Sequence, residues 1–452
     1  MENFNKMQLY YNTDFYNTLT LVQRKISSEY PDLFSEDFFI SSEEDKKQKI
    51  RGCIDQYVRE HNLKVKNIPN RETLSELLYN DMVKESVLTD YIEDSEDKYE
   101  EININAWNDI EVHRRDGVRE KIAHFCSPKH AYDVLKRMAA QSGAKLDAAM
   151  PMCEANLKDN TRIAILAYPL VDLDVYVAAS IRMVKPTNFK RDKFLSTDTL
   201  NEQEMEFLEM AVKHGISTLF VGPVGSGKTT LLNYILTTFP NLSRIYSIEN
   251  NARELSLVKK DSEGNIINSV VHTITHPSDD PKYTVDEDLL LEKALRFDPD
   301  LIAVGEMRSA ESYAAEEASL SGHTVVSTIH SFGARAAHLR VVTLCNKKHY
   351  NPNTQDALLQ AAMAFPLIVC IRRLNDNHRH VMEITECEIV NDTERKYNKL
   401  FGYQVDKNEI DPKGNFTIKG HHQTFNKPGP SLIQTMINCG ATTQELKSIG
   451  LI

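Results

Sequence analysis

The chain has 452 residues with a formal net charge of -12, and 41% of its residues are hydrophobic and 26% charged. Its length exceeds that of one typical hydrophobic core, so we expect two or three domains of an ordinary globular protein. The acidic balance argues against a dedicated nucleic-acid-binding protein. The seven scattered cysteines, without a C-x-x-C pair, indicate neither a structural zinc site nor a disulfide framework. We therefore expect reduced thiols in a cytoplasmic protein. No apolar run approaches the ~18 residues that span a bilayer, so we expect a soluble protein.

Residues 1–95 are predicted to form a helical leader, because residues 45–60 and 71–88 place apolar side chains at helical spacing among many charges. The leader runs into an acidic stretch, residues 90–101, which contains seven acids and one lysine. A charge run of this kind is usually solvated. We interpret it as an acidic linker, and a docking peptide for a partner is the alternative.

Residues 96–183 are predicted to form a smaller α+β domain. Apolar and polar residues alternate in 102–107 and 110–113, residues 128–142 favour a helix, and residues 161–182 contain further strand-like runs. Residues 184–198 are polar, contain a proline and lack periodicity. We therefore expect a linker there between two domains.

Residues 199–452 alternate between helix and strand patterns. Helix-start signals lie at 199–204, and Thr284 and Glu287 have the spacing of a capping box, which predicts another helix start. The alternation predicts an α/β domain with a largely parallel sheet flanked by helices. The expected strands are 216–221, 244–249, 271–276, 300–304, 324–329, 367–371 and 381–390, and the expected helices are 228–239, 310–321, 354–364 and a small helical tail.

Residues 222–229 read G-x-x-x-x-G-K-T between a predicted strand and a predicted helix, which is the Walker A pattern of a phosphate-binding loop. Its glycines let backbone N–H groups converge on an anion, and the following helix adds its positive N-terminal end. Lys228 is expected to reach the β- and γ-phosphates of a nucleotide, and the Thr229 hydroxyl to hold Mg²⁺. The predicted nucleotide-binding residues are Gly222, Pro223, Val224, Gly225, Ser226, Gly227, Lys228, Thr229 and Thr230.

Hydrolysis also needs a carboxylate near the γ-phosphate. Two of the predicted strands end in a glutamate that could supply it. The buried run 300–305 leads to Glu306 and resembles a Walker B segment, so Glu306 is the candidate that orients the attacking water. Glu249 ends another strand and is a candidate catalytic residue and Mg²⁺ ligand. His330 follows the strand 324–329 and is expected to sense or position the phosphates, whereas for His323 a structural and a functional role are equally open.

The Walker A loop, the acidic box at Glu249, the sequence VGEMR at 304–308 and the box from Gly322 to His330 occur in the order found in type II/IV secretion ATPases. The resemblance covers about residues 70–450. It implies a RecA-like P-loop ATPase domain, ATP and Mg²⁺ as cofactors, a homo-hexameric ring and a place at the inner face of the cytoplasmic membrane. It further implies a membrane platform protein as partner.

The first domain is similar to the CpaF-type branch of that family, which drives Flp or Tad pilus assembly. The resemblance implies that arginines of this domain close over the nucleotide, so Arg162 and Arg182 become candidate stabilisers of transition-state charge. The motif residues that carry it are Asp147, Pro151, Met152, Ala155, Leu157, Asp159 and Arg162, followed by Ser180, Ile181 and Arg182.

Two positions depart from the family pattern. Asn250 follows Glu249 where the family usually has aspartate, which removes a negative charge near the metal. Ala106 stands where the family has a glycine in a V-N-G turn, and alanine resists a positive φ.

The sequence therefore predicts a Mg²⁺-dependent ATPase that powers Tad/Flp pilus assembly or type II/IV-like secretion by rotation of its domains about residues 184–198. A nucleotide-gated scaffold that binds ATP without useful turnover is one alternative, which Asn250 keeps open. A nucleic-acid translocase of the same motor class is the other, although no nucleic acid is expected to bind.

Overall fold

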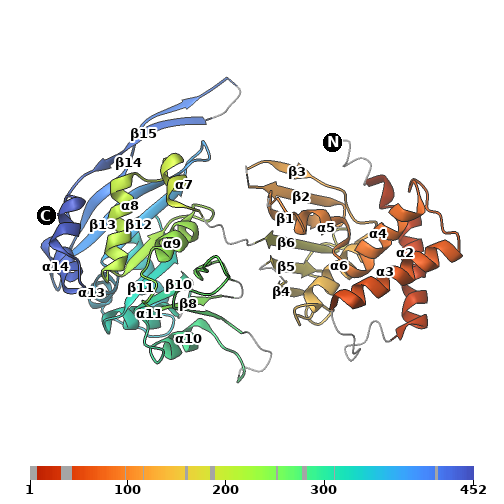
Figure 1. The fold of residues 1–452 in the computed structure, drawn as a ribbon, viewed down its shortest axis with the longest axis horizontal. Coiled ribbons are helices and arrows are strands. Elements are labelled where there is room, and N and C mark those ends of the chain that lie inside the picture. The colour runs from red at the N-terminus through yellow and green to blue at the C-terminus, as the bar shows by residue number, and fades with distance from the viewer. Residues whose placement is uncertain are drawn as a thin grey trace. The chain divides into compact units, whose positions relative to one another are not determined.

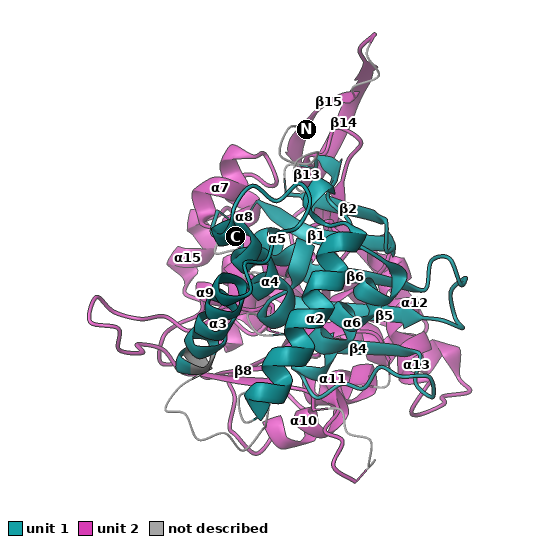
Figure 2. Ribbon diagram, turned by 90° about the vertical axis from the view of Figure 1, so that its right-hand side faces the viewer, with its two compact units in different colours: residues 1–185 teal, residues 186–452 magenta. Residues whose placement is uncertain are grey.

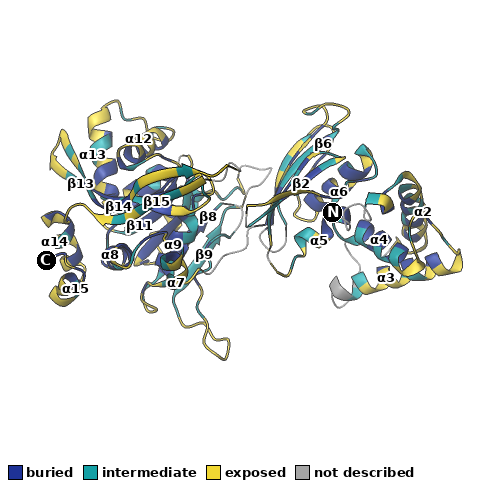
Figure 3. Cartoon of the chain, turned by 90° about the horizontal axis from the view of Figure 1, so that it is seen from above, coloured by how far each residue is buried: buried dark blue, intermediate teal, exposed yellow. Residues whose placement is uncertain are grey.

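The computed structural model describes residues 8–31, 43–96, 98–115, 117–157, 161–183, 189–250, 253–276, 282–309, 311–412 and 416–452. The chain divides into two compact units, Met1–Lys185 and Pro186–Ile452 (Figure 2). In each unit the buried residues gather in the sheet and on the inner faces of the helices (Figure 3). Within the described residues, no helix is both long and apolar enough to cross a membrane.

The first unit contains a six-stranded antiparallel sheet with the order β3-β2-β1-β6-β5-β4. Burial alternates along its strands, as in β5, where Ile163 and Ile165 are buried and Ala164 and Leu166 are exposed. One face of the sheet therefore meets the core. The strands are β1 (Tyr99–Ala106), β2 (Asp109–Arg114), β3 (Arg119–Lys121), β4 (Met152–Asn156), β5 (Thr161–Ala167) and β6 (Val177–Met183).

Helices cover that face of the sheet (Figure 1) and share one hydrophobic core with it. Asn12, Asn70 and Ser127 cap three of them through their side chains, which supplies partners for otherwise unpaired helical N–H groups. The helices are α2 (Thr13–Glu29), α3 (Glu43–Glu60), α4 (Arg71–Val83), α5 (Thr89–Ile92) and α6 (Pro128–Ala140), with a 3₁₀ turn at Ser86–Leu88.

The acidic stretch 90–101 is not a linker, so that interpretation is wrong. Most of α5 and the first residues of β1 lie within it, and the Tyr91 and Tyr99 rings meet edge to face at 5.1 Å. These two tyrosines pack against the shared core, which holds the stretch on the fold. Ala106 closes β1 opposite Asp109.

The second unit is built on a nine-stranded sheet with the order β15-β14-β13-β12-β7-β11-β10-β8-β9. The six strands from β12 to β9 are parallel, and the last three along the chain are added antiparallel. The phosphate loop follows the central strand β7 and leads into a helix, which confirms the predicted RecA-like α/β fold. The strands are β7 (Thr218–Val221), β8 (Ile245–Glu249), β9 (Val270–Ile274), β10 (Leu301–Met307), β11 (Thr324–Ile329), β12 (Leu367–Arg373), β13 (Arg379–Asn391), β14 (Glu394–Ile410) and β15 (Phe416–Thr424).

Both faces of this sheet are buried. Phe220 of β7 belongs to one hydrophobic cluster, whereas its neighbours Leu219 and Val221 belong to another on the opposite face. Alternation along a strand thus feeds two cores, each covered by helices. The helices are α7 (Arg191–Ser196), α8 (Glu202–Lys213), α9 (Lys228–Thr237), α10 (Glu287–Ala294), α11 (Glu311–Leu320), α12 (Ala334–Cys345), α13 (Thr354–Ala364), α14 (Pro430–Asn438) and α15 (Thr443–Ser448).

One local prediction in this unit is wrong. Thr284 does not cap a helix: α10 begins at Glu287, and the Asp286 side chain accepts the Leu289 N–H at 2.9 Å. The boundary between the two units falls within the expected linker 184–198, whose second half contains helix α7 with the Phe194 side chain buried in the core of the second unit. Residues 184–188 of the expected linker lie outside the described residues.

Candidate active site

The phosphate loop passes close to β12. A Cβ atom on Gly222 would lie 2.1 Å from the Ile371 carbonyl oxygen and 2.8 Å from Ser226 Oγ, so a side chain does not fit there. Gly225 and Gly227 have φ values of 72° and 95°, a region that glycine enters at little cost. The loop conformation therefore depends on the three glycines of the motif.

Lys228 is the first residue of α9 and points back along the loop. Its Nζ donates to the carbonyl oxygens of Gly222 at 3.0 Å and Pro223 at 2.9 Å, and only 7% of the residue is exposed. The positive end of α9 and the buried ammonium are thus adjacent, an arrangement that suits an anion.

Glu306 and His330 form a chain of contacts to this loop. Glu306 Oε1 is 3.0 Å from His330 Nε2, and His330 Nδ1 is 3.2 Å from the Gly222 carbonyl oxygen and 3.5 Å from Lys228 Nζ. These residues come from β10, the end of β11 and the loop after β7, which are neighbouring parallel strands. Parallel strands bring their carboxyl ends to one edge, which assembles the site.

Charge around Glu306 favours its ionised form. Burial raises the pKa of this carboxyl, but the Arg308 guanidinium, which donates to Glu306 Oε2 at 2.7 Å, and the nearby His330 and Lys228 outweigh it. The pKa therefore lies below its ordinary value, and Glu306 is a carboxylate at neutral pH.

Glu249 ends β8 and is 3% exposed. Its Oε2 accepts the backbone N–H groups of Glu254 at 2.5 Å and Leu255 at 2.8 Å, whereas its buried Oε1 has no hydrogen-bond partner among the described residues. Burial raises its pKa to about 7, and the two N–H groups oppose that shift.

Asn250 donates its side-chain N–H to Glu287 Oε1, at the start of α10. The sequence indicated only a helix-capping role for Glu287, because this residue approaches the acidic box only through the tertiary fold. It places a carboxylate beside the position where the family usually has aspartate.

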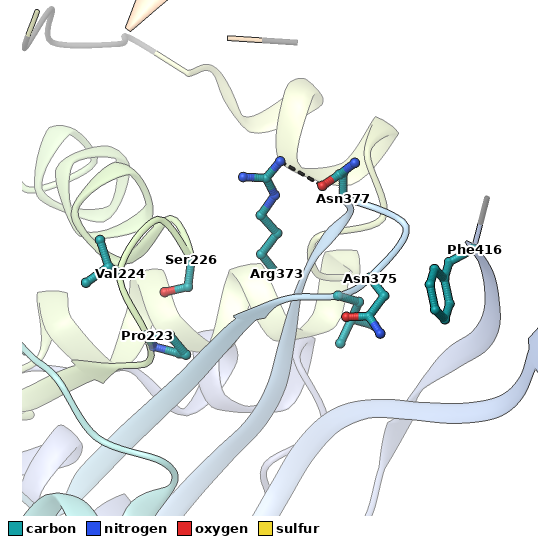
Figure 4. A pocket seen from close by; sticks show the side chains of 8 residues that line it. Pro223, Val224, Ser226, Arg373, Asn375, Asn377 and Phe416 are labelled. Carbon is teal, nitrogen blue, oxygen red and sulfur yellow. Dashed lines mark hydrogen bonds between the residues drawn. The ribbon is translucent and has the colours of Figure 1, made fainter. Parts of the chain in front are cut away.

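Arg379 is a second residue that sequence patterns did not reveal. It begins β13, and its Nε donates to the Gly225 carbonyl oxygen at 3.1 Å. Nearby, a cavity of about 580 Å³ lies between the phosphate loop and the turn after β12. Figure 4 shows Arg373 in this cavity, where it donates to Asn377 Oδ1 at 2.7 Å. The other labelled lining residues are Pro223, Val224, Ser226, Asn375 and Phe416.

The remaining predicted site residues lie elsewhere. His323 is at the amino end of β11, 3.3 Å from Ser321 Oγ, and so at the opposite end of the strand from His330. Arg162 and Arg182 are directly paired across β5 and β6 in the first unit, so both side chains lie on the face of the sheet away from its helices. Asp159 lies outside the described residues.

These residues fit a nucleotide with Mg²⁺. The loop, the α9 N-terminus and Lys228 suit the phosphates. Two buried oxygens, Ser226 Oγ and Glu249 Oε1, have no hydrogen-bond partner among the described residues and are hard oxygen donors of the kind that Mg²⁺ and its waters take. Of the predicted metal ligands, Thr229 is the second residue of α9 and Glu249 is the last residue of β8.

Comparison with known proteins gives a family. The profile of the family described as type II/IV secretion system protein matches residues 85–408. The type IV secretion system protein PtlH of Bordetella pertussis is 32% identical over 187 residues, 40% of this chain and 52% of that protein. An uncharacterised protein of Methanocaldococcus jannaschii is 30% identical over 203 residues, 45% of this chain and 35% of that protein.

Among solved structures, the Legionella pneumophila ATPase DotB has 23% identity and a TM-score of 0.45, over 66% of this chain and 78% of that one. The chain spans about a third to a half of the length of the first curated relatives that it matches. The profile match alone covers more than two thirds of this chain and contains the phosphate loop, Glu249, Glu306 and His330. The chain therefore belongs to the type II/IV secretion system protein family.

Proposed function

We propose that the protein hydrolyses ATP with Mg²⁺ at the site built around the phosphate loop. The observation that carries this is the contact chain from Glu306 through His330 to Gly222 and Lys228. It joins a carboxylate that is ionised at neutral pH to the loop that would hold the phosphates. Such a connection suits a residue that orients water and a second that responds to the presence of the γ-phosphate.

Each residue then has a role. Lys228 neutralises phosphate charge, Glu306 orients and polarises water, and His330 holds Glu306 against the loop. The Thr229 hydroxyl and Glu249 would hold Mg²⁺ or its waters, and the bound ion would neutralise phosphate charge. Glu287 supports the assignment despite Asn250, because it keeps a carboxylate next to the acidic box.

We assign Arg162 and Arg182 to the same reaction as stabilisers of transition-state charge. They are paired side by side on β5 and β6, so they present two guanidinium groups from one patch of the sheet. Replacement of either arginine by alanine is expected to reduce turnover and to leave the phosphate loop of the second unit intact.

The work done by hydrolysis is proposed from the family and from the CpaF-like motif of the first unit. The protein would act as a homo-hexameric motor on the inner face of the cytoplasmic membrane. There it would engage a membrane platform protein and drive assembly of a Tad/Flp-type pilus or protein secretion. PtlH is named as part of a type IV secretion system, which supports the secretion branch of this proposal.

Two variants test the reaction in the purified full chain with Mg²⁺ and ATP. Lys228→Ala is expected to abolish nucleotide binding and turnover. Glu306→Gln is expected to bind nucleotide as the parent does but to release phosphate at least about 100-fold more slowly, since a positioned base contributes about 10²–10⁴. Glu317→Gln, on the exposed side of α11, is the matched control and is expected to match the parent. Parent-like hydrolysis by Lys228→Ala would refute the site.

A nucleotide-gated scaffold is the second candidate, and Asn250 favours it because an amide stands where the family usually has a carboxylate. The same measurement separates the two proposals. Equal, near-zero phosphate release by the parent and Glu306→Gln, with nucleotide binding retained in both, would establish the scaffold. Turnover that rises in proportion to added DNA would instead support a translocase.

A further inference from the structure

Two histidines and an aspartate from distant parts of the second unit converge away from the phosphate loop. Asp198 follows α7, His380 is the second residue of β13, and His422 lies on β15. Their candidate ligand atoms all lie within 4.8 Å of one another. This cluster, Asp198, His380 and His422, has no role in the reaction proposed above.

The distances define how the three groups face each other. His380 Nδ1 is 2.6 Å and His422 Nε2 is 3.0 Å from the Asp198 carbonyl oxygen. The carboxylate oxygens of Asp198 lie 4.0 Å from His380 Nδ1 and 3.7 Å from His422 Nε2. Ligands in a tetrahedral zinc site, each about 2.1 Å from the ion, are about 3.4 Å apart, close to these carboxylate–imidazole separations. Because both ring nitrogens converge on the Asp198 carbonyl oxygen, that backbone oxygen has to turn away or become a ligand when the ion enters.

A buried carboxylate lies behind one of the histidines: the Oε2 atom of Glu204, which also accepts the Asn201 N–H at 2.9 Å in the capping box of α8. Glu204 of α8 is 0% exposed, and its Oε2 lies 2.8 Å from His422 Nδ1, the nitrogen that faces away from the cluster. Its Oε1 is buried without a hydrogen-bond partner among the described residues. A carboxylate on the far nitrogen of a histidine is the usual outer partner in a carboxylate–histidine–metal arrangement.

The residues around His380 hold its ring in place, and the cluster remains accessible to solvent. His380 is 3% exposed, and its ring stacks on Tyr403 with centroids 3.8 Å apart. A cavity of about 350 Å³, lined by Asp198, His380 and Tyr403 among others, opens beside the cluster. Water from this cavity could complete the coordination of an ion, and the exposed Asp198 carboxylate gives the ion access from solvent.

We propose that Asp198, His380 and His422 bind a divalent transition-metal ion of the Zn²⁺ class. Imidazole nitrogens with one carboxylate suit such an ion, whereas Mg²⁺ prefers oxygen ligands alone. Without the ion, both imidazoles donate to the Asp198 carbonyl oxygen, and the ion replaces these two hydrogen bonds. The site contains no cysteine, which is why the cysteine spacing gave no sign of it.

The ion would tie the segment that enters the second unit to the antiparallel strands. Asp198 belongs to that segment, and His380 directly follows Arg379, whose side chain reaches the phosphate loop from the opposite face of β13. The site is separate from the proposed Mg²⁺ site and does not depend on the ATPase proposal.

The test measures metal binding to the purified full chain after treatment with a chelator. We titrate Zn²⁺ by calorimetry and Co²⁺ by its visible absorption, which reports nitrogen and oxygen ligands without thiolate. His422→Gln and Asp198→Asn are compared with His421→Gln, the matched control on the same strand, whose ring contacts Asp406 instead. Asparagine is used at 198 because the residue has a φ of 54°, which asparagine tolerates.

The parent and His421→Gln are each expected to bind one equivalent of ion. His422→Gln and Asp198→Asn are expected to bind it more than about 10-fold more weakly, since loss of even an outer partner costs 10–100-fold in metal affinity. Lys228→Ala is expected to retain it. Zn²⁺ is also expected to raise the melting temperature of the parent but not of Asp198→Asn, whose exposed side chain carries little packing. Equal binding by the parent and His422→Gln, or no Zn²⁺-dependent rise in the parent, would overturn the site.

Discussion

Gly222 lies where the phosphate loop passes against β12, and this contact makes the residue irreplaceable. In Gly222→Ala the new Cβ would meet the Ile371 carbonyl oxygen, which is backbone and cannot turn away. We expect loss of nucleotide binding together with about 1–3 kcal/mol of lost stability, the usual cost of overpacking. Nucleotide titration and chemical denaturation of the full chain measure the two effects.

The control is Gly52→Ala in the middle of α3, where a Cβ would meet no atom within 4 Å. The same substitution is expected to stabilise the protein there by about 0.5–1 kcal/mol, because alanine favours a helix. If Gly222→Ala binds nucleotide as tightly as Gly52→Ala, the loop does not need its close approach to β12.

Glu316 is a buried carboxyl that gives the stability a pH dependence. Burial on α11 raises its pKa to about 7, a hydrogen bond to Cys345 opposes this, and Glu317 adds to it. Between the ordinary carboxyl pKa and about 7 the folded state therefore holds a proton that the unfolded state has lost. The contribution of Glu316 to stability is complete below that range and falls as the pH rises through about 7.

Glu316→Gln removes this titration, so the variant is expected to be more stable than the parent at pH 8 by about 1–3 kcal/mol and to gain little at pH 5. Chemical denaturation at both pH values gives the comparison, with Glu292→Gln, exposed on α10, as control. An equal difference between parent and variant at the two pH values would contradict the assignment.

Local spacing explains which site residues could be found from the sequence. Gly222, Lys228 and Thr229 belong to one contiguous motif, and Glu306 and Glu249 each end an apolar run. Residues adjacent in the sequence are therefore enough to identify these five site residues. Glu287 and Arg379 reach the same site through α10 and β13, and no local pattern marks them. The three residues of the cluster, Asp198, His380 and His422, lie far apart in the sequence, so no motif spacing indicates them.

Helices and strands were predicted correctly where burial gives their apolar residues a regular spacing in the sequence. The parallel strands and their helices were expected because both faces of the sheet are buried and their sequences are apolar. β14 and β15 were missed because polar residues dominate both strands, and the buried residues of β14 form one run, 400–403, without alternation. The N-cap of α10 is Asp286 and not Thr284, because a capping residue must directly precede the first helical turn.

The start of β13 contributes to the loop through a single side chain. Arg379→Ala removes the hydrogen bond to Gly225 and the packing of the arginine stem, which lies 3.2 Å from where a Cβ on Gly227 would be. Nucleotide affinity is expected to fall about 2- to 10-fold, the equivalent of one hydrogen bond. Arg395→Ala on β14, which contacts Gln355, is the control in the same titration and is expected to match the parent. Unchanged affinity in Arg379→Ala would mean that β13 does not support the loop.

At the scale of the molecule, each unit has its own hydrophobic core. The core of the first unit contains residues from 10 to 183, and the two clusters of the second unit contain residues from 194 to 451. The phosphate loop, Glu249, Glu306 and His330 all belong to the second unit, whereas Arg162 and Arg182 belong to the first. We therefore expect the second unit to bind the phosphates without the first unit, and the first unit to be needed for stabilisation of the transition state.

Fragments 1–183 and 189–452 test that separation. Each is expected to unfold cooperatively, and a non-hydrolysable ATP analogue with Mg²⁺ is expected to stabilise only fragment 189–452. At 100 times the dissociation constant the gain is about 2.7 kcal/mol, a shift of several degrees in melting temperature. Fragment 189–452 should bind the analogue yet fail to hydrolyse ATP at the full-chain rate, because it lacks both arginines. Full-chain turnover by that fragment would remove Arg162 and Arg182 from the reaction, and a nucleotide-dependent shift in fragment 1–183 would mean that the first unit binds the phosphates by itself.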